Sequence, residues 1–525
     1  MNRYTALRGA AAPEPQAAPG WQLTQWQPAS RLFGANGIQF GPDGRLYVAQ
    51  AFGDQITAVD VSDGRLEVIV PQGGPIISPD DVAFDSHGTM YATEVMHARV
   101  SARTASGDIR VVADDVPSAN GITVYQDRLF IDEFRRDGRL LELYPDGSRP
   151  PRLIAERLLG PNALAAGPDG KLYFPKVPLG EIWRVDIETG VLEKVAEGLA
   201  APPAVKFNQR GELIVPQSRT GEIVRIDVQS GAKTVIATVR PGIDNLAFAA
   251  DDRLFISHFV DGGVAEVATD GSSAERVLVP AGFVGPWGLV YDEAGTLYVA
   301  DGLSLAAVSA AGEVTRLGGA LDERFPGFVR AIAAGAPGEL LLTTARGDVV
   351  RYCIAERSFT TPGQKLHQLY GLAAAGDGAI VVAEASRGVL LRVDDAGQVS
   401  TLATDLSQPC DVVAAGDGTF LVSETGAGRV ITVDAQGHVA PIRSGFTKPK
   451  GLALYHDGRI LVLDHGTNEL WAVDLHTQQQ HVLASHLPVG ATGAMDFPGG
   501  LAVSRDGTIY IAGDGEGSIL TLRRV

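Results

Sequence analysis

The sequence predicts an all-β protein, and three observations carry this prediction. Glycine is abundant, at 63 of 525 residues, whereas methionine occurs only 4 times, a composition that suits short strands and tight turns. No long stretch shows the 3.6-residue periodicity of a helix. One unit of about 42 residues also recurs along the whole chain. Recurrence at this period is typical of β-propellers.

Each unit starts at a residue that we call the anchor, which is polar in most units. It continues through an apolar run, a turn and a second strand. Clear copies are NGIQFGPDGRLYVAQ from Asn36, NALAAGPDGKLYFPK from Asn162 and KGLALYHDGRILVLD from Lys450. The twelve anchors, spaced by 40 to 49 residues, are Asn36, Asp80, Asn120, Asn162, Pro203, Asp244, Trp287, Arg330, Tyr370, Cys410, Lys450 and Gly499.

Four short strands account for each unit. In the unit from Asn162, the apolar run is strand A, LYFPK is strand B, EIWRV opens strand C, and VLEKVAEG is strand D. The turn between strands A and B holds Asp-Gly or a similar pair, which supplies the backbone conformations that tight hairpins require. Each unit is therefore expected to form one four-stranded blade.

Twelve blades exceed the four to eight that one ring usually holds, so we expect two tandem six-bladed β-propellers. The predicted domains are a disordered tail at 1–21, a first propeller at 22–272 and a second at 273–525. The last unit lacks a strand D, and residues 22–27 form a spare strand. We expect 22–27 to complete blade six and 275–280 to complete blade twelve, which leaves no edge unpaired.

The composition of the chain limits the classes of molecule that it is expected to bind. The net charge of −18 argues against nucleic acid and anionic membranes, which need a basic footprint. No apolar run approaches the roughly 20 residues that span a bilayer, and the N-terminus shows no secretory signal. Two cysteines make no disulfide framework. We expect a cytoplasmic protein that acts on a small molecule, with its oligomeric state open.

The anchors are expected to face the axis of each ring, because strand A is the innermost strand of a blade. Five of the six anchors in the first ring are Asn or Asp, and none is in the second. Their oxygens suit a hard cation such as Ca²⁺ or Mg²⁺. The alternative for Asn36-Gly37 and Asn120-Gly121 is turn chemistry, since Asn and Gly tolerate left-handed backbone geometry.

Polar residues also end strand B, and they predict a second ring around the same channel mouth. We expect Glu94 and Glu133, together with Asn36 and Asn245, to contact substrate. Solvated loop carboxylates are the alternative for Glu94 and Glu133, and a structural role is the alternative for His258.

At these residues the chain resembles the gluconolactonase/senescence-marker-protein family and, more distantly, the paraoxonases. The matching motifs are SPDDV around Asp80, SANGI around Asn120, GPNAL around Asn162 and GIDNL around Asp244. The resemblance covers roughly residues 30–270, and LYVADG at 297–302 also resembles an NHL repeat. Family members are six-bladed propellers with a divalent cation in the channel, and many hydrolyse lactones or esters.

The resemblance implies a metal site made by Asp80, Asn120, Asn162 and Asp244. We expect a divalent cation there, with Ca²⁺ favoured and Mg²⁺ or Zn²⁺ as alternatives. The family carries Glu and Asp where this chain has Asn36 and Asn162, so two carboxylates are replaced by amides.

The predicted activity is metal-dependent hydrolysis of a lactone or ester in the first propeller. Asp244 or His258 would act as the base, and Lys176 would steady a developing oxyanion. Two alternatives stay open. One is a lyase or hydrolase site in the second propeller, built from Arg330, Arg346, Tyr370, Glu384, Glu424, Lys450 and His465. The other is a non-catalytic binding or scaffold protein.

Overall fold

The computed structural model describes residues 13–320, 322, 325–490 and 497–525, and it is built almost entirely of antiparallel strands. The strands form twelve sheets, eleven of four strands and one of five. The chain divides into two compact units, residues 31–282 and residues 1–30 with 283–525. We call these the first and second propeller. The prediction of an all-β chain with four-stranded blades in two propellers is confirmed.

The first propeller consists of six blades in chain order, each a meander whose first strand is innermost. Its strands are β3 (Ala35–Phe40), β4 (Leu46–Gln50), β5 (Gln55–Val59), β6 (Leu66–Val70); β7 (Pro79–Phe84), β8 (Met90–Glu94), β9 (Arg99–Arg103), β10 (Ile109–Ala113); β11 (Ala119–Tyr125), β12 (Arg128–Glu133), β13 (Gly138–Leu143), β14 (Arg152–Leu158); β15 (Ala165–Ala166), β16 (Leu172–Lys176), β17 (Glu181–Val185), β18 (Leu192–Ala196); β19 (Lys206–Phe207), β20 (Leu213–Pro216), β21 (Glu222–Ile226), β22 (Lys233–Thr238); and β23 (Ile243–Phe248), β24 (Leu254–His258), β25 (Val264–Val267), β26 (Glu275–Val279). The short 3-10 helix η1 (Val177–Leu179) follows β16.

The second propeller also has six blades within the part of the chain that the structure describes. Its strands are β27 (Gly288–Tyr291), β28 (Leu297–Asp301), β29 (Ser304–Val308), β30 (Val314–Gly319); β31 (Val329–Ala334), β32 (Glu339–Thr344), β33 (Val349–Cys353), β34 (Ser358–Gly363); β35 (Leu369–Ala374), β36 (Ile380–Glu384), β37 (Val389–Val393), β38 (Val399–Ala403); β39 (Pro409–Ala414), β40 (Phe420–Glu424), β41 (Arg429–Val433), β42 (Val439–Ser444); β43 (Pro449–Leu454), β44 (Arg459–Asp464), β45 (Glu469–Asp474), β46 (Gln480–Ser485) with β1 (Gln16–Ala17); and β47 (Leu501–Val503), β48 (Ile509–Gly513), β49 (Ser518–Arg524) with β2 (Trp21–Gln27). The 3-10 helix η2 (Ala385–Arg387) follows β36.

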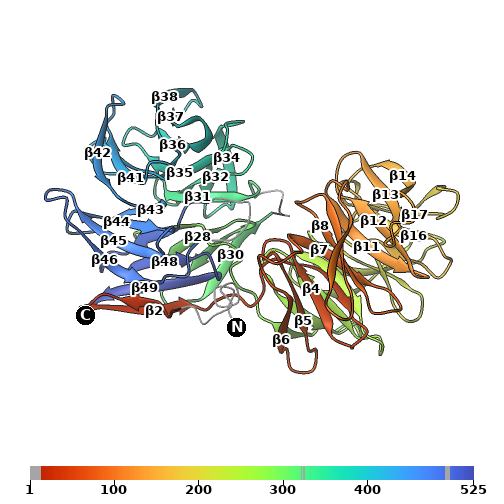
Figure 1. Cartoon of the computed structure of the whole chain (residues 1–525). Coiled ribbons are helices and arrows are strands. Elements are labelled where there is room, and N and C mark those ends of the chain that lie inside the picture. The colour runs from red at the N-terminus through yellow and green to blue at the C-terminus, as the bar shows by residue number, and fades with distance from the viewer. Residues whose placement is uncertain (1–12, 321, 323–324, 491–496) are drawn as a thin grey trace. The chain divides into compact units, whose positions relative to one another are not determined.

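The predicted strand exchange between the rings is wrong. β2 pairs antiparallel with β49 and completes blade twelve, and Figure 1 shows the red N-terminal strand beside the blue C-terminal one. β26 pairs with β25 and completes blade six instead. β26 thus stays with the three strands that precede it in sequence, and β2 supplies the fourth strand that the last unit lacks. The sequence pattern contained no information on which open edge β2 would choose, because both edges look alike.

The unit boundary also differs from the predicted one, since it falls between Gly282 and Phe283 rather than near residue 272, and residues 22–27 belong to the second propeller. The predicted disordered tail ran from 1 to 21. Residues 1–12 lie outside the described residues, but Gln16–Ala17 form β1 against β46, and Trp21 starts β2. In the chain, the first propeller therefore lies between β2, which completes blade twelve, and β27, which opens blade seven of the second propeller.

The two rings close in different ways. In the first, apolar side chains of blade one, such as Ile38 and Val48, share a buried cluster with Ala247 and Phe255 of blade six. The first propeller thus closes by packing of two blades that are each complete in sequence. In the second, β2 supplies the outer strand of the last blade, and strand pairing adds to the packing.

A β-bulge marks the anchor in eight blades. In β7, Pro79 pairs with Glu94 and Val82 with Ala92, so Asp80 and Asp81 together oppose one residue of β8. Equivalent shifts occur in β3, β11, β23, β31, β35, β39 and β43. Bulges re-aim side chains next to functional sites. The anchors therefore have a distinct backbone conformation in both rings.

A hydroxyl behind the bulge ties neighbouring blades together. The Thr93 hydroxyl accepts the Asp81 N–H at 3.1 Å and donates to the carbonyl of Asn120, the next anchor, at 2.6 Å. Ser257 bonds Asn36 in the same way, and Thr343 bonds Tyr370 in the second propeller. These bonds satisfy buried backbone groups that the bulge removes from the strand ladder.

Candidate functional site

Carboxylates from separate blades meet in the channel of the first propeller. Asp80 and Asp81 occupy the bulge of β7 in blade two, and Asp244 occupies that of β23 in blade six. Burial raises the pKa of Asp244 well above its usual value, and the charges of Asp80 and Asp81 raise it further. The three carboxylates therefore lie within electrostatic range of one another.

Burial has the same effect on the neighbouring acids. It raises the pKa of Asp80 to about 7, with a further contribution from Asp81. It raises the pKa of Asp81 to about 6, although the Lys206 ammonium, followed by two backbone N–H groups and Asn245, acts in the opposite direction. Lys206 and Asp81 were not among the predicted site residues. The signal was present in the repeat, because Lys206 lies three positions after anchor Pro203, where Gln39 follows Asn36.

Asp132 is a second acid that the sequence analysis left outside the site. It lies directly opposite the bulge of β11, where blade two carries Thr93, and its side chain is fully buried. One oxygen accepts the Gly121 N–H at 3.1 Å. Burial raises the pKa of Asp132 to about 8, with Asp81, Asp80 and Glu133 adding to the shift. A carboxyl group thus replaces the usual hydroxyl beside anchor Asn120.

Several oxygens at this mouth have no protein partner. Neither carboxylate of Asp80 and Asp244 forms a hydrogen bond or ion pair with another residue of the first propeller, all of which the structure describes. Buried oxygens of Asp81, Asn120 and Asp132 also lack a partner. Unpaired buried oxygens are costly unless a cation or water satisfies them. Carboxylate and amide oxygens in this mixture are the donors that Ca²⁺ and Mg²⁺ prefer.

The other two predicted amide donors are already engaged. The Asn36 oxygen accepts the Ala51 N–H at 3.2 Å, and the Asn162 oxygen accepts the Ala163 N–H at 2.7 Å. No three His, Cys, Asp or Glu side chains of the described chain are grouped so that they alone could hold a metal. A cation here would therefore need amide oxygens as well as the two open carboxylates, and the donor chemistry fits that requirement.

Turn chemistry does not account for the Asn-Gly pairs. Asn36, Gly37, Asn120 and Gly121 all have negative φ, so no left-handed conformation is involved. A Cβ atom at Gly37 would lie 2.1 Å from a carboxylate oxygen of Asp81. The glycines are needed because the next blade packs against the bulge. Asn36 and Asn120 are therefore not explained by a need for left-handed turn geometry.

The carboxylates predicted to bind substrate at strand B ends have partners of their own. Glu94 is fully buried, binds Arg99 and accepts the Ile77 N–H at 2.8 Å. Glu133 is fully buried and binds Arg135 and Arg139. Neither is the solvated loop carboxylate of the alternative interpretation. Asn245 is buried, and its oxygen accepts the Leu246 N–H at 2.9 Å.

The same arrangement recurs around both rings. The residue at the end of strand B accepts a backbone N–H from the loop that leads into its own strand A. The pairs are Gln50 with Phe33, Gln217 with Ala200, Asp301 with Val284, Glu384 with His367, Glu424 with Ser407 and Asp464 with Thr447. Together with the bond from Ile77 to Glu94, such a tie holds the loop in place in seven of the twelve blades. This recurrence was visible in the sequence, and it favours a structural role.

The two predicted proton-transfer and oxyanion residues lie in contrasting environments. His258 is buried with neither ring nitrogen hydrogen-bonded, and burial followed by the charge of Arg240 lowers the pKa of His258 to about 4. Its imidazole is therefore neutral at neutral pH. The Lys176 ammonium lies 3.7 Å from the ring centroid of Trp183, and partial burial lowers the pKa of Lys176.

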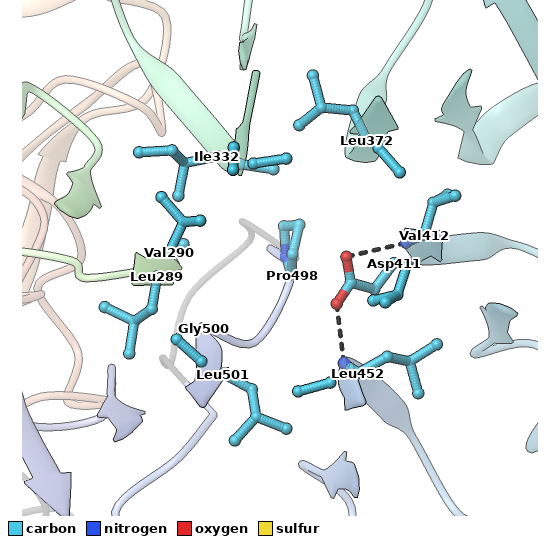
Figure 2. A pocket seen from close by; sticks show the side chains of 18 of the residues that line it. Leu289, Val290, Ile332, Leu372, Asp411, Val412, Leu452, Pro498, Gly500 and Leu501 are labelled. Carbon is cyan, nitrogen blue, oxygen red and sulfur yellow. Dashed lines mark hydrogen bonds between the residues drawn. The ribbon is translucent and has the colours of Figure 1, made fainter. Parts of the chain in front are cut away.

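The channel of the second propeller is apolar. A cavity of about 320 Å³ is lined by the innermost strands of all six blades, and Figure 2 shows Leu289, Ile332, Leu372 and Leu501 around it. Asp411 is the one carboxylate among the described residues of its wall. Its two oxygens accept the N–H groups of Val412 at 2.9 Å and Leu452 at 2.8 Å, as the dashed lines in Figure 2 mark.

The acid–base set considered for the second propeller is not assembled as an open site. Glu384 binds Arg387, and Glu424 binds Arg429, in addition to their backbone ties. Both carboxylates are fully buried. Arg330, Tyr370, Lys450 and His465 do gather near the channel mouth, whereas Arg346 is exposed.

A six-bladed propeller with oxygen donors at its channel mouth defines the class of this protein, and comparison of sequences gives the family. The family model described as "SMP-30/Gluconolactonase/LRE-like region" matches residues 19–303 and 331–524. The chain belongs to this family, and the match extends over both propellers. The resemblance inferred from the anchors is thereby confirmed. A comparison with curated proteins finds no match.

Solved structures were compared as well. A streptogramin B lyase structure is 18% identical, with 56% of this chain and 98% of that chain covered and a TM-score of 0.40. A nidogen/laminin complex is 21% identical, with 39% and 80% covered and a TM-score of 0.35. The extracellular domain of a putative one component system from B. thetaiotaomicron is 12% identical, with 91% and 69% covered and a TM-score of 0.34. Among the described residues, no helix has the length and apolar character needed to cross a membrane.

Proposed function

We propose that the first propeller is a metal-dependent hydrolase that acts on a lactone or ester of a small organic molecule. One observation carries the proposal. The carboxylates of Asp80 and Asp244 lie within electrostatic range of each other, and the buried amide oxygen of Asn120 has no hydrogen-bond partner among the described residues. Membership of a family that includes gluconolactonases supports a lactone or ester as the class of substrate.

The residues that would hold a divalent cation are Asp80, Asp244 and Asn120, with Asn162 beside them. A bound cation polarises a carbonyl and lowers the pKa of a bound water. Ca²⁺ is favoured, because it accepts a mixed set of carboxylate and amide oxygens with flexible geometry.

The protein's own residues would position the substrate and move the proton. Asp244 is a candidate base, because its carboxylate has no hydrogen-bond donor among the residues of the first propeller. His258, at the end of β24 in the same blade, is the second candidate, since its neutral imidazole has a free lone pair. Its lowered pKa makes it a weak base in the free protein. His258 would therefore act as the base only if bound substrate raises the proton affinity of the imidazole. Lys176 is the candidate for stabilising a developing oxyanion.

The first experiment is elemental analysis of the purified protein before and after chelation, followed by assay of a panel of lactones and aryl esters with Ca²⁺, Mg²⁺ or Zn²⁺. We expect a bound divalent ion and metal-dependent turnover. His258→Gln should lower turnover by about 10²–10⁴ if His258 is the base, without loss of metal. Asp244→Asn should lower both metal content and turnover.

The control is Lys171→Gln, which removes an ion pair of Lys171 with Glu193 in the blade turns of the same propeller. This variant should retain metal and turnover. Absence of bound metal, or absence of turnover on the whole panel with metal bound, would overturn the hydrolase proposal and favour a binding or scaffold role. A catalytic site in the second propeller has less support, because its Glu384 and Glu424 are committed to arginines.

A further inference from the structure

Cations occupy anchor positions of the second propeller that hold other residues in the first. Arg330 is the bulge residue of β31, and Lys450 is the bulge residue of β43. The first propeller has Asp80 and Pro203 at the corresponding anchors. The bulge of the second blade therefore carries a positive charge in the second propeller and a negative charge in the first.

Arg330 is partly buried and has no carboxylate partner among the residues that the structure describes. One terminal nitrogen donates to the Leu369 carbonyl at 3.3 Å, and its buried Nε has no partner. The guanidinium lies 5.6 Å from the ring centroid of Tyr370 and 6.0 Å from that of Phe497. Burial lowers the pKa of Arg330, because removal from water disfavours the charged form. A buried guanidinium that lacks an anion is costly to the fold.

Lys450 lies close to the same aromatic residue. It is 3% exposed, and its ammonium donates to the Phe497 carbonyl at 3.1 Å. Arg330 and Lys450 therefore both approach Phe497, from blades eight and eleven. Burial lowers the pKa of Lys450 as well.

Aromatic rings form a flat apolar wall beside these cations. Phe497 stacks on Trp287 with ring centroids 4.0 Å apart, and Phe328 stacks on both. Two further nitrogens at this wall, the indole nitrogen of Trp287 and Nε2 of His465, are buried without hydrogen-bond partners. Unpaired nitrogens and a stacked wall occur together here, and each points to a ligand with acceptor atoms and a planar apolar body.

We propose that the channel mouth of the second propeller binds a small organic carboxylate with a planar apolar body. Its carboxylate would accept hydrogen bonds from Arg330, whose guanidinium matches a carboxylate in two-pronged fashion, with Lys450 adding positive charge. The apolar body would lie against Trp287 and Phe497. The site goes beyond the proposed hydrolase function and does not depend on it, because no metal donor of the first propeller takes part.

The test uses the full chain and three probes: benzoate, its neutral isostere benzamide, and acetate, which has the charge without the ring. Isothermal titration calorimetry should show benzoate binding more tightly than both. Arg330→Gln should weaken benzoate binding by at least about tenfold, since a hydrogen bond to a charged group is lost. Arg330→Lys keeps the charge but not the paired donors, and it should fall between Arg330→Gln and the parent protein.

Two controls separate this site from the rest of the molecule. Arg505→Gln removes an exposed arginine of the same propeller, which is ion-paired with Glu293, and should leave benzoate affinity unchanged. Asp80→Asn alters the first propeller only and should also leave it unchanged. The proposal fails if benzoate does not bind or if benzamide binds equally well. It also fails if acetate binds as tightly as benzoate, or if folded Arg330→Gln protein retains full affinity.

Discussion

The two propellers share a backbone plan and differ in what their channels hold. Both have bulges at the anchors, hydroxyls that tie blade to blade, and strand B ends that hold the entry loops. The first channel presents the open carboxylates of Asp80 and Asp244, whereas the second has the cations Arg330 and Lys450 above an apolar cavity. Features that recur in both rings serve the fold. Features that change at an unchanged backbone position identify the sites.

Closure is the second difference between the rings. The first propeller is continuous in sequence, and its first and last blades meet through side-chain packing. The second depends on β2, which reaches its last blade from the other end of the chain. The first propeller can therefore be inserted as one piece, while the second needs both chain segments to be complete.

Removal of β2 should give the largest effect, and it should fall on the second propeller. Deletion of residues 1–28 removes a strand paired with β49 at six positions from Trp21 to Gln27. At roughly 1 kcal/mol of net stability per hydrogen bond, together with lost apolar packing, several kcal/mol should be lost. Urea denaturation with a separate transition for each propeller measures the loss of unfolding free energy. Hydrogen exchange then shows in which propeller the loss occurs. Selective loss of protection in residues 31–282 would contradict the observed pairing.

The strand B ties should be equally important in the two rings. Glu94→Ala and Glu424→Ala each leave a partly buried arginine without its partner, and each should cost about 3–5 kcal/mol of unfolding free energy. Glu94→Gln should cost less, because Gln50 and Gln217 hold the same loops with an amide. Urea denaturation of the three variants provides the measurement. An unaltered stability of Glu94→Ala, with loss of substrate binding, would return Glu94 to a substrate role.

Metal should stabilise one ring only. Ca²⁺ at a hundredfold excess over Kd should add about 2.7 kcal/mol to the unfolding of chelated protein, through binding to the folded state alone. Asp80→Asn should abolish most of this gain, and Arg330→Gln in the second propeller should leave it intact. Differential scanning calorimetry with and without Ca²⁺ reads out the shift. A gain that survives Asp80→Asn would remove Asp80 from the metal site.

Stability of the second propeller should depend on pH through Asp411. Burial raises the pKa of Asp411 to about 7, from 3.8 in the unfolded chain. Between these values the folded state binds a proton that the unfolded state releases, so this contribution to stability falls as pH rises. The slope is at most about 1.4 kcal/mol per pH unit. Asp411→Asn should flatten the urea-denaturation profile from pH 5 to 7.5, and parallel profiles for the two proteins would contradict the assignment.

The blade-to-blade hydroxyls should give the smallest effects, with the larger one at Thr93, because its hydroxyl also accepts the Asp81 N–H at 3.1 Å. Thr93→Val in the first propeller and Thr343→Val in the second each remove one hydrogen bond to the next anchor carbonyl, of 2.6 and 2.8 Å. Each should lower the free energy of unfolding by about 1–2 kcal/mol, because a buried carbonyl loses its donor. Thermal unfolding of the pair tests this. A clearly larger loss of stability for Thr343→Val than for Thr93→Val would contradict this expectation.

Local pattern was sufficient for much of the architecture. The period of about 42 residues, the Asp-Gly turns and the alternation of short apolar runs predict four strands per blade and twelve blades, since all four strands of the first ten blades come from contiguous residues. The anchors were also visible in sequence, because they recur at the same point of each repeat, where eight of the blades have a bulge. Asp80, Asp244 and Asn120 could therefore be proposed as oxygen donors of one site before their surroundings were known.

The tertiary structure decided what depends on contacts between distant segments. The sequence did not show that β2 completes blade twelve, because two equivalent strand edges compete for one strand and the choice depends on where the chain ends lie. Nor did it separate Glu94, tied to Arg99 and Ile77, from Asp80, which lacks partners, since both are acids at the ends of strands. A structural carboxylate is distinguished from an available one by its burial and by its hydrogen-bond partners. Both depend on how the blades pack in the folded ring.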